Sequence, residues 1–276
     1  MALFVIVATS TPILYDAFYV NRYLNRNAPP NYYVPQVTTL WKTVTGALVC
    51  QFLKYIVEHI TYPIFYKIAK GEKGSQLRDI YAKKASFNAF LVIFYTGSSI
   101  WGYKVLKNSG FLWKELGGDS KRPLLEAFSQ FPFEERFEGM MDYSFYTFGY
   151  HVSSLFLHIF FAKRLNDYEE MLVHHLTTCF LYLGYFFGNF QVIGVLIAFL
   201  HDLADIPTAL IKLLGSTIYK TATLAVFLPL VITWGYTRLY VFPQIILVTF
   251  TEFGPISMDN AEKVGHSGYL LYALCI

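Results

Sequence analysis

The chain has 276 residues, of which 55% are hydrophobic, 19% aromatic and only 15% charged. Soluble domains carry about a quarter charged residues, so this composition excludes an ordinary soluble domain and indicates a membrane protein. The net charge of +3 is small, and Lys and Arg lie in connectors and helix ends, which argues against nucleic acid as a partner. The three cysteines have no CxxC spacing, so neither a disulfide framework nor a zinc site is predicted.

Residues 1–80 are expected to form a membrane-associated region with one or two spans. Residues 1–20 are apolar but lack the basic start and cleavage site of a signal peptide, which favours a retained segment. Residues 40–68 are long enough to cross a hydrocarbon core of about 30 Å, and their few charged side chains are expected to face protein or the interface.

A connector rich in basic residues precedes the next predicted span, at residues 85–103. Cytosolic loops carry an excess of Lys and Arg, so this connector is expected to be cytosolic. Residues 104–139 mix both charges with Gly, Pro and Ser and show no sustained apolar face, which predicts a loop on the opposite side. The basic residues of the connector are Lys67, Lys70, Lys73, Arg78, Lys83 and Lys84.

Three further spans are predicted at residues 140–162, 171–187 and 190–214. Lys163 and Arg164 return the chain to the cytosol after the first of them, and Gly188-Asn189 predicts a tight turn after the second. No internal repeat and no phosphate-binding glycine motif is present, so a nucleotide-driven pump is not predicted.

The last predicted span, residues 221–250, is longer than a straight crossing needs and contains Arg238 and Pro243. We therefore expect a tilted or broken helix, with a buried partner for Arg238. Residues 268–276 would form a helix of roughly 14 Å, too short to cross, so we expect the chain to stop inside a span, as a truncated sequence would. The predicted fold is all-α, a polytopic transmembrane helix bundle.

Two adjacent histidines, His174 and His175, lie about one turn into a predicted span. Ionisable groups at membrane depth are costly and mark functional sites. Successive side chains of a helix point in directions about 100° apart around its axis, so the two imidazoles cannot share a face. His174 and Thr178, four residues apart, can share one. One imidazole is expected to act as general base or nucleophile and the other to orient a substrate. Alternatively, both bond only to backbone or lipid headgroups.

His201, Asp202 and Asp205 share one stripe of the following helix, because they are spaced three and four residues apart. A helical hairpin joins this helix to the one that carries His174, so the stripe can supply a carboxylate that fixes an imidazole tautomer. The alternative is a polar clasp in which Asp202 or Asp205 pairs with Arg238 for packing alone.

A metal site is less favoured than a base. Adjacent helical histidines are poorly placed to hold one ion, and the repeated histidine boxes of membrane di-iron enzymes are missing. His151 and His158 lie seven residues apart on one helical face, and we interpret them as packing histidines.

The run Lys-Arg-Leu-Asn-Asp-Tyr-Glu-Glu-Met-Leu-Val-His-His-Leu-Thr-Thr, at residues 163–178, closely resembles the Lag motif of ceramide synthases in the TLC-domain family. Gly194, the run from His201 to Asp205, and Thr237-Arg238-Leu239 followed by Phe242-Pro243 resemble later signals of the same family. We expect residues 81–276 to form a TLC domain that is truncated in its last span.

The resemblance implies a bundle of about six spans in the endoplasmic reticulum membrane that condenses a fatty acyl-CoA with a sphingoid base to form (dihydro)ceramide. One histidine would receive the acyl chain or deprotonate the amine. The implied catalytic residues are His174, His175, Asp202 and Asp205. The expected substrate-binding residues are His201, Thr178, Arg238 and Asp167.

The thioester of acyl-CoA, the co-substrate, supplies the leaving group, so no metal or other cofactor is expected. Membrane lipids are further expected partners, and a homodimer or heterodimer is left open. Directly before the aspartate of its motif, the family has another basic residue, where this chain has Leu165 and Asn166. The chain therefore lacks one basic side chain that could contact the phosphates of CoA.

The main alternative function is a non-catalytic TLC-domain protein that binds or senses lipid or joins a membrane complex. Retention of four ionisable side chains within predicted spans speaks against it. A fatty-acid elongase-like enzyme is disfavoured because its HxxHH box would need a histidine where Met171 stands.

Overall fold

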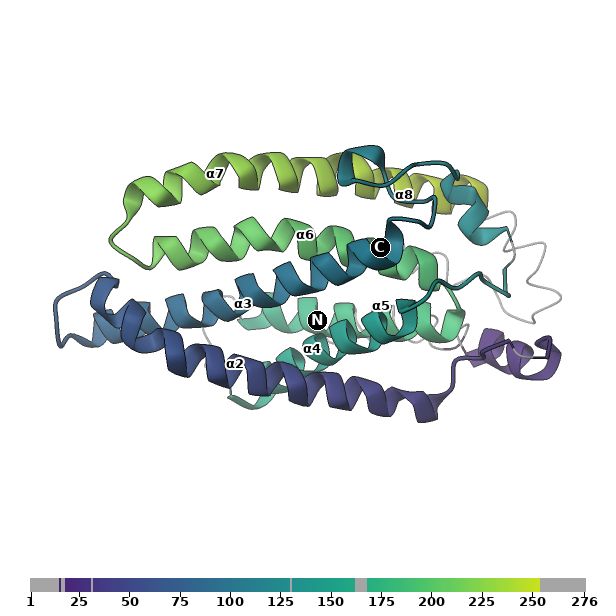
Figure 1. The fold of residues 1–276 in the computed structure, drawn as a ribbon. Helices are drawn as coiled ribbons and strands as arrows, with labels where there is room; N and C mark the ends of the chain where they lie inside the picture. Colours follow the sequence, from purple (N-terminus) through teal and green to yellow (C-terminus); the bar gives the residue numbers. More distant parts are fainter. Residues whose placement is uncertain (1–14, 16–17, 31, 130, 162–167, 254–276) are drawn as a thin grey trace. The chain divides into compact units, whose positions relative to one another are not determined.

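The computed structural model describes residue 15 and residues 18–30, 32–129, 131–161 and 168–253. Several sequence predictions fall largely or wholly outside these residues: the apolar segment at residues 1–20, the short segment at residues 268–276, and the predictions that rest on residues 163–167, including the role of Asp167. Within the described ranges every regular element is helical, as the all-α prediction requires (Figure 1).

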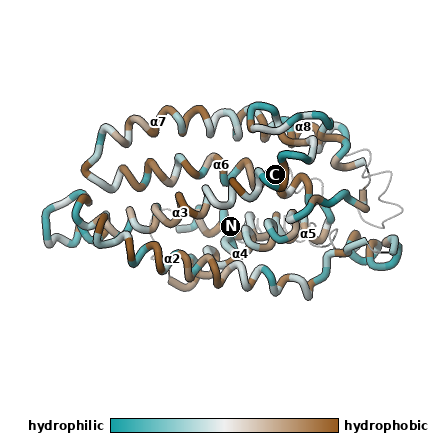
Figure 2. Tube along the Cα trace, viewed as in Figure 1, coloured by the Kyte–Doolittle hydropathy of each residue, from teal (hydrophilic) through white to brown (hydrophobic). Residues whose placement is uncertain are grey.

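A helix lies at each predicted span. Three described helices are long and apolar enough to cross a membrane by length and composition, at Gln76–Leu106, Gln191–Gly215 and Lys220–Val248. Figure 2 shows hydrophobic residues running along α6 and α7. The helices are α2 (Trp41–Ile68), α3 (Gln76–Leu106), α4 (Met140–Phe161), α5 (Tyr168–Gly188), α6 (Gln191–Gly215), α7 (Lys220–Trp234) and α8 (Phe242–Val248).

These elements form two compact units that interleave along the chain. The first unit contains Met1–Leu48, Lys104–Leu196 and Gln244–Ile276, and the second contains Val49–Tyr103 and Ile197–Pro243. Helices α2, α3 and α6 each contribute residues to both units. Each unit is described below by itself.

In the first unit, α4 packs against α5 through aromatic side chains. Phe148 stacks on Tyr182 with ring centroids 5.2 Å apart. On α4, Gly149 faces the backbone of α2, where an added Cβ would lie 2.5 Å from the Ala47 nitrogen and 2.6 Å from the Thr43 oxygen. Glycine therefore lets two helix backbones approach closely, which is how helices associate where lipid removes the hydrophobic driving force.

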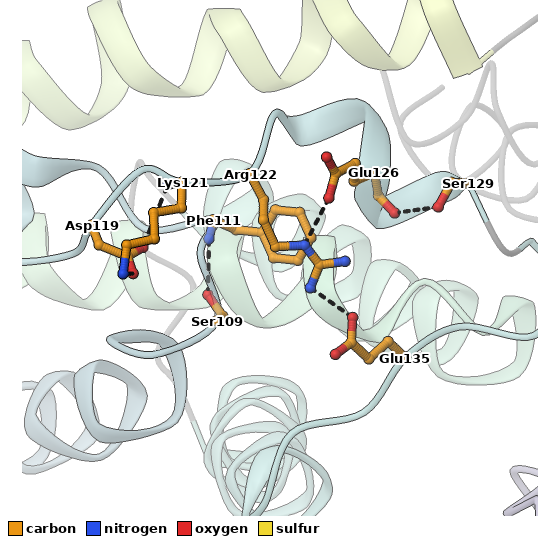
Figure 3. A network of polar contacts seen from close by, with 8 residues as sticks. All are labelled: Ser109, Phe111, Asp119, Lys121, Arg122, Glu126, Ser129 and Glu135. Atoms are coloured by element: carbon orange, nitrogen blue, oxygen red, sulfur yellow. Dashed lines mark hydrogen bonds and ion pairs between the residues drawn. The ribbon is translucent and has the colours of Figure 1, made fainter.

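The predicted loop at residues 104–139 is a packed segment with two short 3-10 turns, Lys114–Leu116 and Leu124–Phe128. The guanidinium of Arg122 lies 4.4 Å from the ring centroid of Phe111 and donates to Glu126 at 2.8 Å and to Glu135 at 2.7 Å (Figure 3). The loop also buries apolar side chains. They include Phe111, Leu112, Ala127, Phe128 and Phe131.

In the second unit, the basic connector after α2 is bonded to the turn between α6 and α7. The Lys70 ammonium donates to the Gly215 carbonyl at 2.6 Å, and the Ile218 N–H donates to the Ile68 carbonyl at 3.0 Å. The buried Arg78 donates to the carbonyls of Tyr66, Lys67 and Gly71, which satisfies oxygens at and just after the end of α2. Two of the basic residues of the connector, Lys70 and Arg78, therefore have structural roles.

The last predicted span is a broken helix, as its length and Pro243 suggested. A π-helical segment, Gly235–Val241, separates α7 from α8, and a second one follows at Thr249–Phe253. Proline has no N–H to continue an α-helical hydrogen-bond ladder, so a wider turn just before Pro243 is physically expected. The π-helical segment carries Arg238.

Candidate active site

The predicted histidine pair lies on α5 in the first unit. His174 is exposed and His175 is half-buried, with ring centroids 5.5 Å apart and planes inclined at 55°. The two imidazoles therefore meet different surroundings. The Nδ1 atom of His175 is buried and has no hydrogen-bond partner among the described residues.

A third imidazole, from His158 on α4, lies beside this pair. Its ring centroid is 5.5 Å from that of His175, and its Nε2 lies 2.9 Å from the Tyr168 carbonyl oxygen. A carbonyl only accepts, so Nε2 carries the proton and Nδ1 is the acceptor nitrogen of the neutral ring. The sequence interpretation as a packing histidine did not anticipate the contact with His175, although the seven-residue spacing correctly placed His151 and His158 on one face, both against α5.

Thr178, predicted to share a helical face with His174 and to bind substrate, donates its hydroxyl to the His174 backbone carbonyl at 2.8 Å. This bond lies within α5 and is the ordinary way for a helical threonine to satisfy its hydroxyl. His151 packs against Tyr182, with ring centroids 5.2 Å apart.

The predicted acidic stripe lies on α6 in the second unit, and its two carboxylates have different partners. Asp202 is buried, and its Oδ2 accepts a hydrogen bond from the Ser98 hydroxyl on α3 at 2.5 Å. Asp205 is less buried, and its Oδ1 lies 3.8 Å from Nη2 of Arg238. Arg238 therefore has an acidic partner, although this partner is partly exposed and not buried as expected. The contact matches the predicted clasp in which Asp205 pairs with Arg238.

His201 lies beside Asp202 in sequence, and its ring is held in one orientation. Its Nδ1 lies 2.8 Å from the Ile197 carbonyl oxygen, and its ring meets that of Phe242 edge-on at 5.3 Å. The neutral ring therefore carries its proton on Nδ1, which leaves Nε2 as the acceptor nitrogen.

Comparison with known proteins decides the family. The family model of the TLC domain matches residues 84–276, which is more than half of the chain. The chain belongs to the TLC-domain family. Within that family it is ceramide synthase-like, because the similar curated proteins include several ceramide synthases and a sphingosine N-acyltransferase-like protein.

The relatives are distant. Ceramide synthase hyl-2 of Caenorhabditis elegans is 23% identical over 79% of this chain and 66% of its own length. Ceramide synthase 4 of Homo sapiens is 27% identical over 65% of this chain and 43% of its own length. The protein FUM17 of Gibberella moniliformis, named as sphingosine N-acyltransferase-like, is 33% identical over 37% of this chain and 27% of its own length. The chain therefore spans less than two thirds of the length of each of these relatives.

Two polar residues outside the predicted set have defined roles in this TLC-domain protein. Ser98 holds Asp202, as described above. Glu134 is fully buried in the loop before α4, where its carboxyl oxygens accept from the backbone N–H groups of Gln191 and Val192 at the start of α6. Burial outweighs these bonds and the nearby Arg136 and raises the pKa of Glu134 to about 8.

Neither residue has a sequence signal. Ser98 sits beside Ser99 in a helix with several small polar residues, and Glu134 adjoins Glu135 in a charged loop. Among the described residues no group of three or more His, Cys, Asp or Glu side chains is placed to hold a metal ion.

Proposed function

We propose that this chain is a membrane N-acyltransferase of the endoplasmic reticulum that condenses a fatty acyl-CoA with a sphingoid base to form (dihydro)ceramide. The names of its relatives support the substrate class. The observation that carries the proposal is the half-buried His175, whose Nδ1 has no partner among the described residues and whose ring lies beside two further imidazoles.

The reaction needs a base because a lipid amine is protonated and non-nucleophilic at neutral pH. An imidazole removes the proton, the amine nitrogen attacks the thioester carbonyl carbon, the new C–N bond forms, and the C–S bond breaks. CoA leaves as a thiolate and takes up a proton. In the covalent version the imidazole nitrogen first displaces CoA, and the amine then displaces the imidazole from the acyl carbon.

In this proposal the catalytic residues are His174, His175, Asp202 and Asp205. One histidine is the base or nucleophile, and the other contacts substrate from its exposed position. Asp202, buried and held by a neutral donor, is suited to orient an imidazole and to stabilise its charged form. His201, Arg238 and Thr178 are secondary candidates for substrate contact.

A second candidate function, lipid binding without catalysis, is favoured by the contact between Asp205 and Arg238. That pair brings two opposite charges together without any substrate. The hydroxyl of Thr178 is likewise bonded within its own helix.

The test is the incorporation of a labelled long-chain acyl-CoA into N-acyl sphingoid base by membranes that contain this chain. We compare His174→Ala, His175→Ala and Asp202→Ala with His59→Ala, a matched control because His59 is exposed and stacks only on Tyr55 of its own helix among the described rings. Loss of amide in the three site variants at equal protein level, with the control active, supports the proposal. No amide from the inserted, folded parent protein would contradict it and favour lipid binding.

A further inference from the structure

Two neighbouring serines of α3, Ser98 and Ser99, are both buried but differ in what their hydroxyls contact. Ser98 is 5% exposed and donates to Asp202 at 2.5 Å. Ser99 is 6% exposed, and its hydroxyl has no hydrogen-bond partner among the described residues. Ser99 is therefore a matched control for Ser98, because both serines are buried in the same helix but only Ser98 bonds to a carboxylate.

The bond from Ser98 is not the usual one for a helical serine. Serine in a helix commonly returns its hydroxyl proton to the carbonyl one turn earlier, as Ser86 of the same helix does with the Ala82 carbonyl at 2.9 Å. Ser98 instead reaches a side chain on α6. Since Asp202 is only 3% exposed, water is poorly placed to replace this donor.

The two aspartates of the stripe are held in different ways. The Asp205 carboxylate lies near the Arg238 guanidinium, whose positive charge compensates its negative charge. Both side chains are partly exposed. Asp202 also interacts electrostatically with Arg238, but its hydrogen bond comes from a hydroxyl on α3, which fixes the direction of the carboxylate. Paired carboxylates in unequal surroundings are typical of sites where the two perform different tasks.

We propose that Ser98 is a positioning residue that fixes the Asp202 carboxylate for the amide-forming reaction. This inference rests on the proposed function, because it takes Asp202 as a catalytic residue and Ser98 as the residue that orients its carboxylate. Partners that orient the ligands of a metal site typically change activity by about 10- to 100-fold when removed, and we expect an effect of this size for the donor to Asp202. The contact between Asp205 and Arg238 also links α6 to the π-helical segment.

The experiment measures kcat and KM for acyl-CoA and sphingoid base in membranes that contain Ser98→Ala, Ser98→Thr or Ser99→Ala. We expect Ser98→Ala to lower kcat by about 10- to 100-fold with KM changed less than about two-fold. Ser98→Thr keeps the hydroxyl and should recover most of the activity. Ser99→Ala should match the parent protein.

A second arm repeats Ser98→Ala in an Asp202→Asn background. If the serine acts through the aspartate, the second substitution lowers the remaining rate little further, because the two effects are not additive. Thermal midpoints in detergent are measured alongside, and equal midpoints for Ser98→Ala and Ser99→Ala separate positioning from packing.

Three results would overturn the inference. They are an unchanged kcat in Ser98→Ala, an equal loss in Ser99→Ala, and an additive loss in the Asp202→Asn background. Each leaves the proposed function intact if the parent protein forms amide and Asp202→Asn forms it much more slowly. Absence of amide from the parent, beside an active ceramide synthase in the same assay, overturns the proposed function and this inference together.

Discussion

At the scale of single residues, Gly194 shows why one of the family-like positions is a glycine. An added Cβ would lie 2.6 Å from the Cδ1 and Cδ2 atoms of Tyr185, far inside contact distance. The Tyr185 ring is only 5% exposed, so it has little room to move. The sequence could show that Gly194 resembles the family, but not that an aromatic ring of α5 is the reason.

We predict that Gly194→Ala lowers the free energy of unfolding by about 1–3 kcal/mol, the usual cost of an overpacked core. Gly97→Ala on α3 is the matched control, because no atom lies within 4 Å of its added Cβ. Alanine is favoured over glycine within a helix by about 0.5–1 kcal/mol, so the control should be neutral or stabilised. Denaturation midpoints in detergent check both, and equal midpoints for the two variants would refute the steric explanation.

The contact between Arg238 and Asp205 also belongs to this scale. We predict that Arg238→Gln and Asp205→Asn each cost about 1–2 kcal/mol of stability, a value reduced from that of a fully buried pair because both side chains are partly exposed. The double variant should cost less than the sum. If the double variant also keeps amide formation, Asp205 is a structural clasp; if it loses activity while remaining folded, Asp205 takes part in the reaction.

At the scale of elements, the six predicted spans all correspond to helices because length and apolarity are local properties of the sequence. The start of α3 at Gln76, nine residues before the predicted span, was missed because its first turns carry charged side chains. Arg78 is buried there only because the carbonyls at the end of α2 need a donor. Such tertiary pairing, like the bond from Ser98 to Asp202, leaves no periodic signal in the sequence.

Glu134, which caps α6, gives a pH prediction for this element. The folded protein keeps the proton of Glu134 up to about pH 8, whereas an unfolded chain releases it near the ordinary value of 4.5. Between these values the unfolded state binds fewer protons, so stability falls as pH rises and levels off above about 8. The groups that oppose or reinforce this shift are Arg136, which lowers the pKa, and Glu135, which raises it.

The measurement compares the parent protein with Glu134→Gln by thermal unfolding at several values between pH 5 and pH 8.5. Glutamine does not titrate, so the stability of the parent relative to the variant should decline across this range, by on the order of a few kcal/mol. A difference that stays constant or grows with pH would mean that the two backbone N–H groups and Arg136 keep the buried carboxyl ionised.

At the scale of the whole molecule, the arrangement of charge predicts orientation in the membrane. Helix α3 has 31 residues and is about 46 Å long at 1.5 Å per residue, which exceeds a hydrocarbon core of about 30 Å. Its two ends therefore belong on opposite sides of the bilayer. The connector before it carries the basic excess typical of the cytosolic side.

We predict that Lys73→Cys and Lys121→Cys, two exposed lysines that lie before and after α3, label from opposite sides. Cys50 and Cys179 are buried, and all three native cysteines are replaced by alanine so that each variant carries one thiol. In sealed microsomes an impermeant maleimide should label residue 73 at once and residue 121 only after permeabilisation. The reverse pattern would invert the orientation, and labelling of both from outside would mean that α3 does not cross. Because an acyl-CoA made in the cytosol is charged and does not pass the bilayer, the cytosolic face that this experiment assigns is also the face at which the proposed reaction must admit its acyl donor.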